Sequence, residues 1–351
     1  MNIVLRKSLL AFAILFAASP IMAMTGSGEN TGNPNDPVRP ALLEVQGGTK
    51  ASLGAQNLGS TVAGGLFSDA RHSISAAANT EYAGWFEVLH NDSKQKQRTG
   101  VDGFSANAKG FVAGMSGRLN TETVLGLSYS YVHTDVDSDD GKKTQVDTNA
   151  LTAYGRWTYE RFYVDGGLTY GQNRHNLKRQ IGSDFSTKAN YEGQSFGLNT
   201  LAGYVFDINR EIIVEPRVAA RYSIVKTDGF TEKDDSTSNQ TTNDERIEAA
   251  VLGAGVRLAS EFEVAEGILE SEIKIMAYHD FIADTSPGTS TYVLGSHTFV
   301  TTGTSPAKDS FELGLGATYR KGDVTVGLGY NRLTKDEFSA DTLTAKVRYD
   351  F

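Results

Sequence analysis

The sequence predicts an all-β fold, a 12-stranded antiparallel transmembrane β-barrel preceded by a short N-terminal helix. Two observations predict this fold. From residue 81 to 351, segments of about ten or more residues alternate apolar with small or polar side chains, as strands between lipid and a lumen do. Tight turns and longer polar links then alternate between the segments. The mean hydropathy of −0.31 excludes a helical membrane protein but not a barrel.

Composition narrows the function classes. The 351 residues carry a net charge of −9, which argues against nucleic acid as a partner. Because the chain has no Cys, disulfides, thiolate catalysis and Cys-ligated metals are excluded, as is a lipid anchor on a processed N-terminal Cys.

The first residues predict export. Arg6 and Lys7 precede an apolar run at 9–18 that is too short to span a bilayer. Pro20 ends the run, and Ala23 supplies a small residue at the expected cut. Residues 1–23 are therefore predicted to be a secretory signal peptide.

Two further segments precede the barrel. Residues 24–57 are rich in Gly, Asn, Pro, Thr and Ser, hold too little apolar surface to offset the entropy of ordering, and are predicted to be a short disordered exported tail. Residues 58–80 are predicted to be a linker or pore helix. Their apolar residues recur at roughly helical spacing among Ala, Ser and Gly: Leu58, Val62, Leu66, Ala70 and Ile74.

Residues 81–351 are predicted to form the barrel itself. In 311–319 the odd positions are apolar and the even ones small or polar, and 324–331 repeats the pattern after a charged Gly turn. The expected strands span 81–96, 103–120, 122–139, 142–160, 161–182, 187–209, 210–229, 243–262, 268–285, 309–321, 323–335 and 338–351.

The links between the expected strands alternate in length. Those at 160–161 and 321–323 are tight, whereas those at 227–243 and 285–308 are long and polar. This asymmetry is typical of outer-membrane barrels, which have short periplasmic turns and longer outer loops. An even number of strands then puts both ends of the barrel on the periplasmic side.

Aromatic residues support the assignment of one face to lipid. Trp157, Tyr159 and Phe162 flank one tight turn, whereas Tyr129 and Tyr170 lie towards the opposite interface. This placement is typical of two aromatic girdles, one at each edge of an apolar band about 25 Å tall.

Charged residues on the polar face of the strands are predicted to line the lumen. Neighbouring charges of opposite sign and water would offset the cost of placing charge inside a membrane-embedded wall. These charged residues either hold a threaded segment or form a generic solvated wall. The predicted set is Glu87, Arg118, Arg156, Asp165, Glu215, Arg217, Arg221, Arg257, Glu270, Glu272 and Lys274.

Three patterns that suggest chemistry are weak in this context. The Gly-Gln-Ser-Phe-Gly run at 193–197 resembles a nucleophile elbow but lies within an alternating strand rather than a strand–turn–helix. The acidic run at 135–141 resembles a Ca²⁺ loop, but Val146 stands where Glu would close it. His279 and Asp280 lack the partners of a hydrolase site. No catalytic residue, metal or cofactor is predicted, and the protein is not expected to be an enzyme.

Several stretches look like parts of a single known family. They are Gly-Phe-Val-Ala-Gly at 110–114, Leu-Thr-Ala-Tyr-Gly at 151–155 running into Tyr-Val-Asp-Gly at 163–166, Val-Glu-Pro-Arg-Val at 214–218 leading to Gly-Phe-Thr-Glu at 229–232, and Leu-Gly-Ala-Gly-Val-Arg-Leu at 252–258. In their order and spacing over 81–351, they resemble the β-domain of autotransporters, the translocator of type V secretion.

The C-terminus carries an independent resemblance. Five residues alternate up to a terminal Phe, as in the signal that the barrel-assembly machinery reads. They are Leu343, Ala345, Val347, Tyr349 and Phe351.

The resemblance implies a location and partners. The barrel would reach the outer membrane after Sec export through the periplasm, helped by periplasmic chaperones and the barrel-assembly machinery. It would contact outer-membrane lipid and lipopolysaccharide. The segment before the barrel would thread the lumen and carry a passenger to the surface, where an extracellular host or surface ligand is one expected partner class. No nucleic acid is expected.

One departure from the family keeps alternatives open. Only about 35 residues separate the expected signal peptide from the expected helix, too few for a stacked β-solenoid passenger. Asn79 is the candidate for self-cleavage in the linker, although it lacks a neighbouring Asn. The alternatives to display of a short segment are a surface adhesin or interaction barrel that acts through its outer loops, a narrow diffusion porin, and an outer-membrane hydrolase.

Overall fold

The computed structural model describes residues 82–97, 102–139, 141–181, 185–234, 239–282, 287–292, 298–302 and 307–351. Every one of these residues belongs to one compact unit. The described part of the chain has no α-helix, and so none that is long and apolar enough to cross a membrane. The expected signal peptide at 1–23, tail at 24–57 and helix at 58–80, which includes Asn79, lie outside the described residues.

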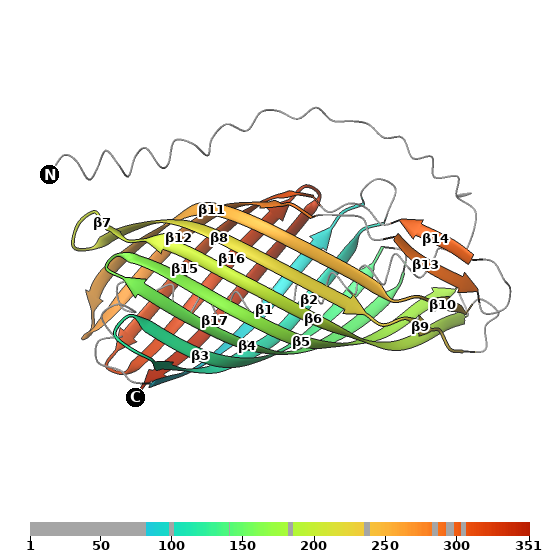
Figure 1. The fold of residues 1–351 in the computed structure, drawn as a ribbon, viewed down its shortest axis with the longest axis horizontal. Coiled ribbons are helices and arrows are strands. Elements are labelled where there is room, and N and C mark those ends of the chain that lie inside the picture. The colour runs from blue at the N-terminus through green and yellow to red at the C-terminus, as the bar shows by residue number, and fades with distance from the viewer. Residues whose placement is uncertain are drawn as a thin grey trace, which may run out of the picture. The chain divides into compact units, whose positions relative to one another are not determined.

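Twelve antiparallel strands close into a barrel, which confirms the predicted fold (Figure 1). Each strand pairs with the next, β8 pairs with β11, and β17 pairs with β1 to complete the ring. The strands are β1 (Tyr82–Gln95), β2 (Phe104–Arg118), β3 (Thr123–Ser138), β4 (Lys143–Tyr159), β5 (Phe162–Ile181), β6 (Phe185–Tyr204), β8 (Ile212–Thr227), β11 (Glu245–Val264), β12 (Gly267–Asp280), β15 (Asp309–Lys321), β16 (Val324–Lys335) and β17 (Phe338–Asp350).

The tight turns gather at the end of the barrel that holds the C-terminus. There the backbone N–H of Phe351 donates to the carbonyl of Tyr82 at 2.8 Å, so both ends of the barrel meet at one seam. Glu160, Ala265 and Gly322 in these turns take φ values of 52°, 47° and 58°, the left-handed conformation that short hairpin loops require. At the opposite end, the link between β16 and β17 is also tight, so the alternation of link lengths is not complete.

The long links at 227–243 and 285–308 contain short strands of their own. They hold β9 (Phe230–Thr231), β10 (Gln240–Thr242), β13 (Pro287–Tyr292) and β14 (Thr298–Thr302), which form a second sheet in the order β14-β13-β10-β9. Figure 1 shows these strands at the end away from the C-terminus. Only the pairing of β10 with β13 joins the two links, and all four strands are too short for an alternating pattern to reveal them.

Two expected strands end earlier than predicted. The strand expected at 187–209 stops at Tyr204, Val205 is buried, and a short β7 (Phe206–Asp207) continues the pairing with β8. The strand expected at 268–285 stops at Asp280. The pairing of β6 and β7 with β8 keeps one register across Val205, so the early end of β6 is a local interruption rather than a change of partner.

A band of the barrel's outer face is apolar. Leu127, Leu151 and Leu328 expose 69, 63 and 66% of their surfaces, whereas the neighbouring Ser128 and Thr152 are buried on the other face. An exposed apolar band of this kind has lipid as its matching environment. At the turn between β4 and β5, the exposed rings of Trp157 and Tyr159 stack at 6.1 Å, and Phe162 meets Trp157 edge-on at 6.2 Å.

Inward-facing aromatic rings lie across glycines of the neighbouring strand. A Cβ at any of these glycines would overlap the ring, so glycine is required by the close approach. The four cross-strand pairs are Trp85 with Gly114, Tyr154 with Gly126, Tyr163 with Gly203, and Tyr278 with Gly253.

Candidate functional site

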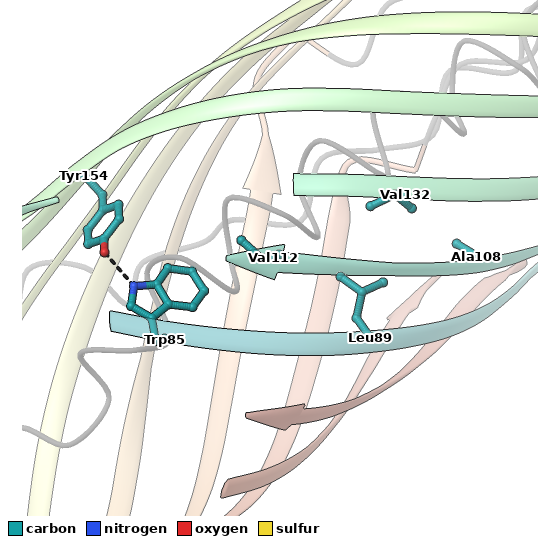
Figure 2. Close-up of a cluster of buried hydrophobic side chains, with 6 residues drawn as sticks. All are labelled: Trp85, Leu89, Ala108, Val112, Val132 and Tyr154. Atoms are coloured by element: carbon teal, nitrogen blue, oxygen red, sulfur yellow. Dashed lines mark hydrogen bonds between the residues drawn. The ribbon is translucent and has the colours of Figure 1, made fainter. Parts of the chain in front are cut away.

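One part of the barrel interior, built by β1 to β4, holds a buried apolar cluster, and we call it the apolar wall; Glu87 also faces inward there. The members of the cluster are Trp85, Leu89, Ala108, Val112, Val132 and Tyr154. The indole Nε1–H of Trp85 donates to the Tyr154 hydroxyl at 2.7 Å, and Figure 2 shows the two rings meeting beside the aliphatic side chains. The Tyr154 hydroxyl donates in turn to the carbonyl of Met115 at 3.1 Å.

The facing wall, from β8, β11, β12 and β15, is charged, and Arg257 lies at its centre. The guanidinium is fully buried and donates to three carboxylates. Its Nη1 lies 2.9 Å from Glu215 Oε1, its Nε lies 2.5 Å from Glu272 Oε2, and its Nη2 contacts Glu270. A buried cation is tolerated only when it is paired in this way.

Glu215 joins Arg257 to a second guanidinium. Arg217, two residues along β8 and therefore on the same face, donates from Nη2 and Nε to Glu215 Oε2 at 2.5 and 3.1 Å. The Tyr163 hydroxyl donates to the same oxygen at 3.0 Å. Arg156 lies over the Tyr163 ring at 4.5 Å.

Arg156 also forms its own buried bidentate pair. Its Nε and Nη2 lie 2.5 and 2.7 Å from the two carboxylate oxygens of Asp165 on the neighbouring strand. This pair lies near the end of the barrel that holds the tight turns, because β4 and β5 meet at such a turn a few residues away.

Glu312 on β15 is a second centre of the charged wall. Its carboxylate lies 2.6 Å from Lys274 Nζ and 3.8 Å from Arg221 Nη2, and it accepts a hydrogen bond from the Tyr278 hydroxyl at 3.0 Å. The Arg221 guanidinium covers the Tyr278 ring at 4.6 Å.

Ion pairs run along the charged wall. They join four carboxylates, those of Glu215, Glu270, Glu272 and Glu312, to four cations, those of Arg217, Arg221, Arg257 and Lys274. Such a wall offers donors and acceptors to a polar segment.

All eleven charged residues predicted from the sequence are buried or partly buried in the described strands. Nine of them enter the contacts above; Glu87 on β1 and Arg118 at the end of β2 lie apart from those networks. Sequence reasoning missed Glu312, although it occupies an even position of the alternating run at 311–319, which was the available signal. It also missed the inward-facing Tyr163 and Tyr278, because aromatic residues were assigned to lipid.

The three weak chemical patterns do not form a site in the described residues. Ser195 is buried on the inner face of β6 with 2% exposure. His279 faces outward and pairs with Asp309 at 2.7 Å, whereas Asp280 faces inward and accepts from the backbone N–H of Ile282 at 3.1 Å. No group of three His, Cys, Asp or Glu that could hold a metal ion occurs in the part of the chain described.

The C-terminal residues singled out in the sequence lie on the outer face of β17. Leu343, Val347, Tyr349 and Phe351 expose 57, 44, 47 and 65% of their surfaces, and Ala345 is partly exposed. The Phe351 and Tyr349 rings meet edge-on at 5.0 Å beside the seam with β1.

Known proteins share both sequence and fold with this barrel. The family model described as the autotransporter β-domain matches residues 84–331. Outer membrane protein A of Rickettsia conorii is 23% identical over 286 residues, which cover 78% of this chain and 14% of that protein. Outer membrane protein B of Rickettsia japonica is 23% identical over 319 residues, which cover 85% of this chain and 19% of that protein. The chain thus spans less than a fifth of the length of these relatives.

Solved structures show the same fold. The translocator domain of the autotransporter NalP from Neisseria meningitidis matches with a TM-score of 0.64 at 17% identity, covering 83% of this chain and 98% of that one. The transport unit of the autotransporter AIDA-I from Escherichia coli matches with a TM-score of 0.56 at 13% identity, covering 77% and 90%. The location predicted from the sequence, the outer membrane, is confirmed by these relatives. With its model matching residues 84–331, the chain belongs to the autotransporter β-domain family.

Proposed function

We propose that this outer-membrane barrel translocates or displays a short N-terminal segment at the cell surface. In this proposal residues 1–23 direct Sec export, residues 58–80 occupy the lumen as a helix, and residues 24–57 reach the exterior. Because β1 begins at the end of the barrel that holds the tight turns, a segment that precedes it must traverse the lumen to reach the opposite end.

The observation that carries the proposal is the contrast between the two inner walls. A helix at 58–80 would set Leu58, Leu66 and Ile74 on one side, which also carries Asp69 and Ser73. It would set Ser68, Arg71 and Ser75 on the other. The apolar side chains of the first side fit the apolar wall around Val112, and the second side fits the ion-paired charged wall around Arg257. The eleven predicted lumen charges then serve to hold and orient this segment.

Cysteine cross-linking tests the helix, because the native chain has no Cys. We expect a short bis-maleimide to join Cys residues placed by L66C and V112C in the folded barrel. The matched pair L66C and L151C should not cross-link, since Leu151 faces lipid with 63% exposure. Equal cross-linking of both pairs, or of neither, contradicts a helix held in the lumen.

Display is tested on intact cells. A protease site inserted within 24–57 should be cut by external protease, whereas the same site in the turn at 265–266, at the C-terminal end of the barrel, should be protected. Protection of the tail contradicts export through the barrel. Cleavage at Asn79 is tested separately. If it occurs, the tail and the barrel separate on a denaturing gel, and N79A keeps them joined.

A second function is favoured by the sheet of β9, β10, β13 and β14. A folded sheet at the outer end offers a defined surface, as an adhesin or interaction barrel that acts through its outer loops requires. Replacing residues 283–306 with a short Gly-Ser link should abolish cell adherence if the sheet binds a surface ligand, provided that the barrel still shows heat-modifiable gel mobility. Unchanged adherence argues against this function.

A further inference from the structure

Four lysines stand directly opposite one another on the outer face, in an arrangement we call the lysine ladder. In the strand register Lys143 of β4 pairs with Lys178 of β5, and Lys178 pairs with Lys188 of β6. Lys188 pairs in turn with Lys233, just after β9, and the two exchange backbone hydrogen bonds of 2.9 and 3.4 Å. All four side chains are exposed.

The ladder carries charge that its neighbours barely neutralise. Of the ion pairs within 4.0 Å in the described part of the chain, the ladder enters one, between Lys143 Nζ and Asp137 Oδ1 at 3.0 Å. Asp234 follows Lys233 in the sequence. Like charges placed directly opposite one another on neighbouring strands destabilise a sheet. A chain with a net charge of −9 nevertheless concentrates four cations here, which points to an anionic ligand rather than to a structural role.

The ladder lies well above the lipid. Leu151, Tyr170 and Phe196 form the uppermost apolar row on these strands, and the ladder residues of β4, β5 and β6 each lie eight positions further along. At about 3.3 Å per residue and a tilt of about 45°, that separation is roughly 19 Å along the membrane normal. A lipid phosphate group at the membrane surface would therefore contact residues nearer the apolar band than the lysine ladder.

A row of amides runs beside the ladder. Gln145, Asn176 and Asn190 are cross-strand partners, one outward-facing position below the lysines. Amides donate to and accept from hydroxyl groups, which a sugar chain carries at every unit. No aromatic residue stands in either row, so the stacking platforms that hold single-stranded nucleic acid are missing from this described surface.

We propose that the lysine ladder and its amide row bind a linear anionic polysaccharide. The strands place one ammonium group about every 4.8 Å along the row, close to the length of one pyranose unit, so a chain with about one charge per sugar matches it. The inference does not depend on what the lumen carries, because every residue involved lies on the outer face.

Binding to an oligogalacturonate of defined length, which carries one carboxylate per sugar, tests the proposal, with the full chain folded in detergent micelles. The ladder variant is K178Q/K188Q/K233Q. The matched control is K94Q/K109Q/K321Q, which removes the same charge from exposed lysines on β1, β2 and β15. We expect the ladder variant to bind at least about tenfold more weakly and the control to stay within about twofold, since exposed charge pairs contribute modestly and additively.

Three outcomes would overturn the proposal. One is an equal loss of affinity in the two variants, which would show that binding depends on net charge and not on the position of the lysines. Another is tighter ladder-dependent binding of a single-stranded oligonucleotide, or of vesicles that carry lipopolysaccharide, than of the oligosaccharide. The third is a lower melting temperature of the ladder variant, because removal of opposed like charges should leave the barrel as stable as before or more stable.

Discussion

Trp85 and Tyr154 are joined by a 2.7 Å hydrogen bond inside the barrel although 69 residues separate them in the chain. Each ring also lies across a glycine of the neighbouring strand, so both are fixed by the pairing of β1 with β2 and of β3 with β4. The contact therefore reports the correct register of four consecutive strands.

Tyr154→Phe should change the environment of Trp85. The chain has two Trp residues, so the background substitution Trp157→Phe leaves Trp85 as the sole indole emitter. Loss of the buried acceptor costs about 1–3 kcal/mol and should shift the emission maximum. Tyr170→Phe on the lipid face is the control. If Tyr154→Phe gives the same emission and melting temperature as that control, the contact does not form in the folded protein.

Arg257→Met should be severely destabilising. The substitution keeps an extended side chain but leaves the buried carboxylates of Glu215 and Glu270 without their shared cation, which costs about 3–5 kcal/mol. The temperature at which the heat-modifiable band is lost measures the effect. Arg332→Met is the control, because the exposed Arg332–Asp341 pair at 3.2 Å should contribute about 1 kcal/mol or less. Similar shifts in both variants would mean that the charged wall is solvated rather than dry.

Gly253→Ala should destabilise the barrel through Tyr278. An added Cβ would overlap the Tyr278 ring and push its hydroxyl away from Glu312, a change that typically costs about 1–3 kcal/mol. Gly166→Ala is the matched control in β5, where an added Cβ meets nothing within 4 Å. Equal melting temperatures for the two variants would show that Tyr278 does not rest on Gly253.

Phe351→Ser tests the proposed assembly signal separately from folding. Phe351 and Phe311 are exposed to nearly the same extent, 65 and 64%, but only Phe351 belongs to the alternating residues of the proposed assembly signal. If the barrel-assembly machinery reads the terminus, Phe351→Ser should lower the amount of barrel in the outer membrane, while Phe311→Ser should not. Both variants should refold into micelles equally well. A parallel loss in cells and in micelles would assign Phe351 a structural role alone.

The sequence by itself determined the class of fold, the number of barrel strands and the face on which each charge lies. Those properties are local, because the period of two along a strand assigns Glu215 and Arg217 to one face without reference to any other strand. The resemblance to the autotransporter β-domain was likewise readable from stretches such as 214–218, and the family match confirms it.

Only the tertiary structure decided which of those residues meet. Arg257 joins Glu215, Glu270 and Glu272 because the stagger of β8, β11 and β12 brings their positions level, and the stagger of a closed barrel depends on all twelve strands together. The sheet formed by the long links and the alignment of the lysine ladder arise in the same way. Their members come from unrelated points of the sequence, and only cross-strand register places them side by side.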